Sequence, residues 1–305
     1  MRALVVGCGY VGLALARELV AQGHEVIGVR RDPGAAAALS EAGIQPWIAD
    51  VSQADAALPE GRFDWIIYCA SAGRETSADA YRRTYVDAQR TLIARYSQEG
   101  FRPAKWIYTG STSVYGQQDG STVKETSLTE PRTETAKILL EAERLLVEAA
   151  RAKFPAIVLR VAGIYGPARL PLMEKFLANQ VRVLSPGTRA MNMIHRDDVV
   201  GSILAALRNG RPGECYNVVD QEPVTEMHFY TWMAETLGKW VPRLHPDDDG
   251  PEAARERLDR KVSNRRLTME LGYRLKYANF RLGYTAEIKQ LTDAGLLEVA
   301  PENRG

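Results

Sequence analysis

Apolar and polar positions alternate along the first half of the chain with two different periods. Apolar residues recur at helical spacing in several stretches, most clearly in 13–22, 78–99 and 133–153. Between these stretches lie short apolar runs typical of buried strands, at residues 3–6, 26–29, 46–48, 65–69, 106–109 and 156–160. Strands that alternate with helices predict right-handed crossovers and a doubly wound, mostly parallel α/β sheet.

The second half of the chain is less regular, because prolines interrupt the pattern from Pro167 onwards. Residues 216–219 still resemble a buried strand, so we expect the sheet to recruit this later segment. The sequence therefore predicts two domains. Residues 1–167 with about 193–220 would form the sheet domain, and about 168–192 with 221–305 would form a smaller α+β domain on the substrate side.

A glycine-rich turn follows the first predicted strand. Gly7, Gly9 and Gly12 form G-x-G-x-x-G, and a helical segment and a second strand come next. In such a unit the glycines allow a tight turn, close approach of the backbone to phosphates, and close helix packing. The helix N-terminus attracts a pyrophosphate. The complete strand–turn–helix–strand context predicts a Rossmann domain that binds a dinucleotide. We expect contacts from Gly7, Cys8, Gly9, Tyr10, Val11 and Gly12, and from Cys69, Ala70 and Ser71 after the fourth strand.

The end of the second predicted strand bears on the choice of nucleotide. An acid at this point binds the ribose hydroxyls of NAD, whereas an arginine suits the 2′-phosphate of NADP. Here Arg30 and Arg31 precede the first acid, Asp32, so the sequence favours NADP over NAD. The alternative is that both arginines are merely exposed at a strand end. Asp50 is expected to accept a hydrogen bond from the adenine amino group, or else to cap a turn, and Val51 to cover the ring.

Composition narrows the possible partners. The 305 residues carry a net charge of +1, with 45% hydrophobic and 25% charged residues. This balance gives no support to a nucleic-acid or anionic-membrane partner, and no apolar stretch approaches the roughly 18 residues that span a bilayer. The three cysteines are far apart and lack the spacing of metal ligands. We expect a cytoplasmic protein with a small-molecule substrate and no metal site.

Further motifs follow the glycine turn in a specific order. Ser111, Thr112 and Ser113 come after a predicted strand, and Lys137 lies in a predicted helix. Later motifs are R-x-x-x-x-Y-G-P at 160–167, I-H-R-D-D-V at 194–199 and Y-N-V-V-D at 216–220. In this order and spacing the motifs resemble the extended short-chain dehydrogenase/reductase family, also called NAD-dependent epimerases/dehydratases. The resemblance runs from Met1 to about Tyr284.

The resemblance implies roles for several residues. By position, Ser111 matches the substrate-orienting serine and Lys137 matches the lysine that holds the nicotinamide ribose. Thr133 stands where the family has its catalytic tyrosine, and a threonine hydroxyl is a far weaker acid than a phenol. The chain therefore resembles an atypical branch, in which Tyr115, or else Tyr85 or Tyr165, is a candidate substitute.

The I-H-R-D-D-V motif has a structural interpretation. His195 is expected to make a hydrogen bond between the domains, and Asp197 and Asp198 to cap the next helix.

Two functions are compatible with these patterns. One is an NADP-binding oxidoreductase or epimerase-like enzyme acting on a small polar or nucleotide-linked substrate. The other is a catalytically silent NADP-binding sensor or regulatory protein, because the tyrosine position holds Thr133. The resemblance leaves a homodimer open. The glycine turn alone also resembles nucleotide-sugar 6-dehydrogenases, but their mechanism needs a reactive cysteine, and Cys215 opens a predicted buried strand.

Overall fold

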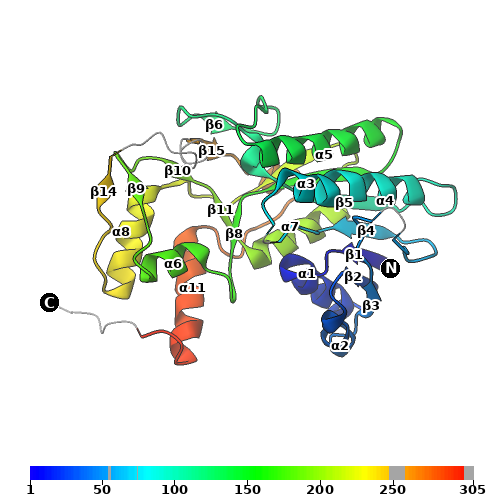
Figure 1. The fold of residues 1–305 in the computed structure, drawn as a ribbon, viewed down its shortest axis with the longest axis horizontal. Helices are drawn as coiled ribbons and strands as arrows, with labels where there is room; N and C mark the ends of the chain where they lie inside the picture. The colour runs from blue at the N-terminus through cyan, green and yellow to red at the C-terminus, as the bar shows by residue number, and fades with distance from the viewer. Residues whose placement is uncertain (54–55, 74, 247–257, 299–305) are drawn as a thin grey trace.

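The computed structural model describes residues 1–53, 56–73, 75–246 and 258–298. Its centre is a seven-stranded sheet in the order β12-β7-β5-β4-β1-β2-β3, in which every neighbouring pair is parallel (Figure 1). The strands are β1 (Arg2–Val6), β2 (Glu25–Arg30), β3 (Gln45–Ile48), β4 (Trp65–Tyr68), β5 (Lys105–Ser111), β7 (Ala156–Val161) and β12 (Cys215–Val218). The predicted strands are thus all present, and the doubly wound α/β fold is confirmed.

Helices cover both faces of this sheet and enclose two cores. On one face α1 (Tyr10–Ala21), α2 (Ala36–Glu41) and α7 (Arg196–Asn209) pack against residues such as Ile107 of β5. On the other face α3 (Ala78–Tyr81), α4 (Ala88–Tyr96) and α5 (Glu134–Arg151) pack against Trp106 and Tyr108 of the same strand. Figure 1 shows these two layers above and below the sheet. Successive side chains of β5 pack into the cores on opposite faces of the sheet, because side chains alternate between the two faces along a strand.

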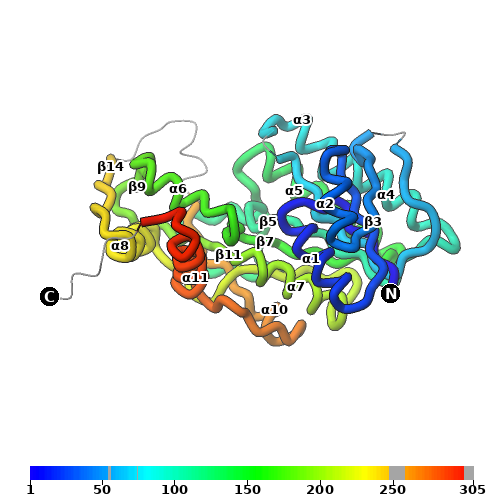
Figure 2. The backbone as a smooth tube through the Cα atoms, turned by 90° about the horizontal axis from the view of Figure 1, so that it is seen from below, coloured from blue at the N-terminus to red at the C-terminus, as the bar shows by residue number. Residues whose placement is uncertain are grey.

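A third core lies at the end of the molecule away from the N-terminus (Figure 2). Its helices are α6 (Pro171–Leu177), α8 (Glu226–Leu237) and α11 (Phe280–Asp293), which bury Phe229, Phe280 and Tyr284 together. Four two-stranded sheets join the later segments to one another. They pair β8 (Gly163–Tyr165) with β11 (Met193–His195), β9 (Val183–Leu184) with β14 (Leu244–His245), β10 (Ala190–Met191) with β13 (Val224–Thr225), and β6 (Thr122–Val123) with β15 (Lys261–Val262).

The cores do not follow the predicted domain boundary everywhere. Val262, with Leu267 of α10 (Arg265–Met269) and Leu271, packs into the first core although we assigned this segment to the second domain. The pattern could not indicate this, because the apolar positions of 262–271 face a surface that only the tertiary structure provides. Residues 247–257 and 299–305 of the predicted second domain lie outside the described residues.

The predicted single helix over 78–99 is divided in the structure. A π-helical segment, η2 (Arg82–Asp87), lies between α3 and α4. Side chains bind its carbonyl groups, because the Tyr68 hydroxyl donates to Thr84 O and Gln89 Nε2 donates to Tyr85 O at 2.8 Å. Insertion of side-chain donors into a helical ladder is a physical cause of such a wide turn.

The start of α7 connects distant parts of the chain. His195 is buried, and its Nδ1 accepts from the Asp197 N–H, so Nε2–H donates to Glu287 on α11 at 3.0 Å. This confirms the structural hydrogen bond expected at His195. The expected capping by Asp197 and Asp198 is wrong, because His195 itself caps α7. Asp198 is instead fully buried and accepts from the Tyr273 hydroxyl at 2.8 Å and from the N–H groups of Lys276 and Tyr277.

Replacing Asp198 with alanine should destabilise the protein by about 3 kcal/mol, because a fully buried carboxylate and its three hydrogen bonds are lost. Urea unfolding followed by circular dichroism measures the change. Asp197→Ala is the matched control. This carboxylate is 28% exposed and pairs with Arg196 and Lys276, so its loss should change stability by no more than about 1 kcal/mol. Equal effects of the two substitutions would contradict the prediction.

Candidate cofactor cleft

The glycine turn packs tightly against the end of β4. Gly7 has φ +83°, and a Cβ atom at this position would lie 2.3 Å from Ala70 Cα. At Gly12 a Cβ atom would lie 2.4 Å from the carbonyl oxygen of Gly7. The first contact fixes the turn beside β4, and the second brings α1 against the turn. Only glycine fits at either position.

The turn ends at the N-terminus of α1. Gly9 is the N-cap residue, so it supplies no capping side chain, and the described first turn contains no acidic residue. The first N–H groups of a helix have no acceptor within it and carry the positive end of its dipole. This end of α1 is therefore suited to an anion.

A cavity of about 850 Å³ opens above the carboxyl ends of β1, β2, β4 and β5. This volume lies within the range of cofactor and small-ligand sites. The structure brings most of the predicted cofactor residues together on its wall, namely Gly7, Gly9, Tyr10, Val11, Arg30, Arg31, Asp50, Val51, Cys69, Ala70 and Ser71. The glycine turn therefore lies at the crevice where parallel sheets of this kind bind ligands.

The two arginines reach different parts of this cavity. Arg30 Nη1 donates to the carbonyl of Cys8 at 3.3 Å and lies 2.9 Å from where a Cβ atom of Gly9 would be. The positive charge of Arg31 interacts electrostatically with Asp50. The Asp50 carboxylate also accepts hydrogen bonds from Ser52 N at 3.0 Å and from Ser52 Oγ at 2.7 Å. Although partial burial opposes ionisation, the Ser52 hydrogen bonds and the Arg31 charge lower the pKa of Asp50. Asp50 thus caps a turn while it also lines the cavity.

Two of the predicted cofactor residues in the glycine turn, Cys8 and Gly12, do not line this cavity. The side chain of Cys8 is buried and faces Gly28 and Ile44, and burial raises the pKa of its thiol to about 12. Gly12 lies beneath the turn. Cys8 and Gly12 instead contribute to the packing of the βαβ unit. The backbone carbonyl of Cys8 accepts the hydrogen bond from Arg30.

The predicted catalytic residues on β5 and α5 are also outside the cavity wall. Ser111 Oγ accepts from Ser113 N at 3.1 Å, and Thr133 Oγ1 caps α5 by accepting from Ala136 N at 3.2 Å. Lys137 is exposed and pairs with Glu134 at 3.3 Å. Glu141, one helical turn after Lys137, pairs with Arg82 and Arg90 and not with this lysine.

Tyr115, the predicted substitute for the catalytic tyrosine, is completely buried instead of facing the cleft. Its hydroxyl donates to Asn217 Oδ1 at 2.8 Å and accepts from Arg160 Nη1 at 2.7 Å. Burial raises the pKa of Tyr115 to about 12. Tyr165 is buried as well, stacked on Tyr284 with ring centroids 4.4 Å apart. Both rings lie in the packed interior and not on the cavity wall. The structure therefore gives no support to the catalytic role predicted for Tyr115.

Further residues complete the cavity wall. Tyr85, one of the three candidate substitutes for the catalytic tyrosine, reaches the wall from η2 together with Thr84, while Tyr81 reaches it from α3 and Thr109 from β5. Burial, with the neighbouring Tyr81, raises the pKa of Tyr85 to about 12. Tyr81 and Tyr85 are four residues apart, which predicts that they share one face of a helix. This spacing does not indicate whether that face lines the cleft.

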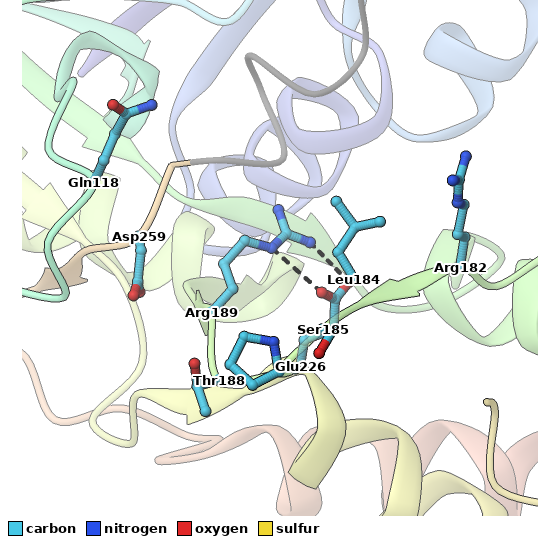
Figure 3. Close-up of a pocket in the computed structure, with 10 residues that line it drawn as sticks. Gln118, Arg182, Leu184, Ser185, Thr188, Arg189, Glu226 and Asp259 are labelled. Atoms are coloured by element: carbon cyan, nitrogen blue, oxygen red, sulfur yellow. Dashed lines mark hydrogen bonds and ion pairs between the residues drawn. The ribbon is translucent and has the colours of Figure 1, made fainter. Parts of the chain in front are cut away.

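A second, smaller cavity of about 370 Å³ lies among the later segments (Figure 3). Arg189 spans part of it and pairs with Glu226 at 2.7 Å, while Gln118 and Asp259 lie on the opposite side from Arg182. The described residues contain no group of three or more His, Cys, Asp or Glu side chains placed to hold a metal ion. None of the described helices is long and apolar enough to cross a membrane.

The sheet and the cavity define a Rossmann-fold protein with a cleft suited to a dinucleotide. The chain belongs to the NAD-dependent epimerase/dehydratase family, whose model matches residues 3–219. Over 281 residues it is 28% identical to the protein YeeZ of Escherichia coli K12, an alignment covering 90% of this chain and 95% of that protein.

Solved structures agree with this assignment. A conserved protein of unknown function from Silicibacter pomeroyi is 29% identical, with a TM-score of 0.77 over 95% of this chain and 98% of that one. The dTDP-glucose 4,6-dehydratase DesIV from Streptomyces venezuelae, with NAD and TYD bound, is 21% identical and has a TM-score of 0.77. It covers 98% of this chain and 99% of its own, and at this identity the likeness shows the fold alone.

Replacing Gly7 with alanine should lower the free energy of unfolding by about 3 kcal/mol or more, because strain at positive φ adds to the clash with Ala70. Gly23→Ala separates these effects. Gly23 also has a positive φ, +79°, but no atom lies within 4 Å of its added Cβ, so about 1–2 kcal/mol is expected. Urea unfolding of both variants checks the difference. A Gly7→Ala variant as stable as Gly23→Ala would contradict the packing argument.

Proposed function

We propose that this protein is an NADP-dependent oxidoreductase or epimerase-like enzyme acting on a small polar or nucleotide-linked substrate. The observation that carries the proposal is the composition of the 850 Å³ cavity. Its wall combines a glycine turn and a helix N-terminus with two arginines at the end of β2, and with Tyr85 and Thr109 further along the sheet. A dinucleotide fits this order of groups, with the pyrophosphate at the helix end.

The preference for NADP rests on Arg30 and Arg31. Both line the cavity at the end of β2, where an adenosine ribose is bound in such folds. A guanidinium binds a phosphate by two parallel hydrogen bonds, whereas it offers no acceptor to ribose hydroxyls. Among the described residues, the only carboxylates on this part of the wall are Asp32 and Asp50. The carboxylate of Asp50 already accepts a hydrogen bond from the Ser52 hydroxyl.

The residues on the wall limit the chemistry. Bound NADP would supply the acceptor or donor for a hydride. Thr133 is committed to capping α5, so we place the proton-transfer role on Tyr85, a partly buried phenol on the cavity wall. Because burial raises the pKa of Tyr85 to about 12, its hydroxyl stays protonated at neutral pH, so it would hydrogen-bond to a substrate carbonyl and give up its proton only to a strongly basic alkoxide. The roles of Ser111 and Lys137 stay predictions.

Replacing Arg31 with glutamine should weaken NADPH binding by about tenfold or more, because a charge-assisted contact with the 2′-phosphate is lost. NADH binding should stay within about twofold, since NADH lacks that phosphate. Isothermal titration calorimetry measures both affinities. Arg17→Gln, on the exposed side of α1, is the control and should affect neither. NADH binding as tight as NADPH binding to the unchanged protein would contradict the preference.

Catalysis is tested separately by the loss of NADPH absorbance in the presence of a panel of carbonyl compounds and sugar nucleotides. We expect oxidation with at least one of them, and Tyr85→Phe should lower its rate about 100-fold or more while NADPH affinity is retained. NADPH binding without oxidation by any compound would contradict an enzymatic role and favour a nucleotide-binding sensor.

A further inference from the structure

One buried arginine lacks the partners that a buried cation requires. Arg260 is 8% exposed, and its Nη2 donates to the carbonyl of Thr112 at 2.9 Å. Its Nε is buried without a hydrogen-bond partner, and no carboxylate pairs with its guanidinium among the described residues. Burying a charge is unfavourable unless it is paired and hydrogen-bonded. The guanidinium, with five N–H donors, thus has unused binding capacity.

A second buried arginine shows how the same chain satisfies a structural guanidinium. Arg160 is 5% exposed and pairs with Glu143, with 2.9 Å between Arg160 Nε and Glu143 Oε2. Its Nη1 donates to the Tyr115 hydroxyl and to the carbonyl of Glu125. Arg260 has about the same burial, but among the described residues its guanidinium has one hydrogen-bond acceptor, the carbonyl of Thr112, and no carboxylate partner. Burial, together with the nearby Arg189 charge, lowers the pKa of Arg260 to about 10.

The backbone around Arg260 is held by three segments. Its carbonyl accepts from Asn192 Nδ2 at 2.8 Å, and the following residues form β15, which pairs with β6. The carboxylate of the preceding residue, Asp259, accepts from Ala190 N at 2.8 Å. A side chain on such a fixed backbone is pre-organised, which lowers the entropy lost when it binds a ligand.

The position of Arg260 connects the end of β5 with the smaller cavity. Thr112, its hydrogen-bond partner, follows Ser111 at the carboxyl end of β5, where parallel sheets bind their ligands. Asp259 and Arg189 both line the 370 Å³ cavity. Arg189 pairs with Glu226 at 2.7 Å, whereas no carboxylate of the described residues pairs with the Arg260 guanidinium.

We propose that Arg260 binds an oxyanion group of the substrate, a carboxylate or a phosphate, between the carboxyl end of β5 and the 370 Å³ cavity. The inference rests on the proposed function, because it assigns a chemical class to the substrate of the same enzyme, at a position beside the 850 Å³ cavity and not on its wall. A planar guanidinium binds either group by two parallel hydrogen bonds.

The test uses the full-length protein with sodium acetate and inorganic phosphate as probes, at an ionic strength held constant with sodium chloride. The Arg260 Nε–H signal in a ¹⁵N-resolved NMR spectrum is identified by its loss in Arg260→Lys. We expect this signal to shift saturably with at least one probe. A response to acetate alone supports a carboxylate, and a response to phosphate alone supports a phosphate. No shift with either probe overturns the proposal.

Thermal unfolding across the same titrations gives the apparent affinity of each variant. Arg260→Gln should bind the active probe at least tenfold more weakly, and Arg260→Lys, which keeps the charge, should be intermediate. Arg265→Met, an exposed arginine nearby, should behave as the unchanged protein. Equal affinities for wild type and Arg260→Gln would overturn the proposal. NADPH titrations of the same samples report separately on the proposed function, because loss of nucleotide binding by wild type leaves the anion result intact.

Discussion

The contact between Gly7 and Ala70 is the constraint on which the cleft depends. The backbone of the glycine turn lies so close to the end of β4 that no Cβ atom fits between them. The N–H groups of Gly7 and Cys8 both donate to the carbonyl of Val29, at 3.2 and 3.0 Å, which ties the same turn to β2. The turn is thus held between the two neighbours of β1. Because the crossovers leave β1 in opposite directions, the crevice opens there, with Arg30 on one side and Ala70 on the other.

The sequence predicted the sheet well because buried parallel strands consist of nearly continuous apolar residues. All six residues of β7 are buried, and the predicted run matches the observed strand within one residue. The predicted glycine contacts followed from the same local signal. The cavity wall at the end of β2 was also predictable, since Arg30 and Arg31 adjoin a strand whose end faces the crevice.

Features that depend on distant side chains were not predictable. The helix over 78–99 has an unbroken helical pattern, yet Tyr68 and Gln89 bind its carbonyl groups and form η2, which brings Tyr85 to the cavity. Tyr115 has the same residue type as a catalytic acid, and only its contact with Arg160 shows that it is structural. Likewise, nothing local distinguishes Arg160 from Arg260. Their partners lie on other segments, Glu143 on α5 for Arg160 and Thr112 after β5 for Arg260, so the difference between them exists only in the folded chain.

Five consecutive residues at the start of α7 couple the cofactor cleft to the rest of the molecule. His195 binds Glu287 of α11, Asp198 binds the backbone of Lys276 and Tyr277, and Val199 lines the 850 Å³ cavity. The side chains of His195, Asp198 and Glu287 are buried, so loss of a partner leaves an unsatisfied polar group in the interior. A displacement of α11 would therefore move the same helical turn that carries Val199. The third core and the wall of the 850 Å³ cavity are thus joined through this turn by direct hydrogen bonds.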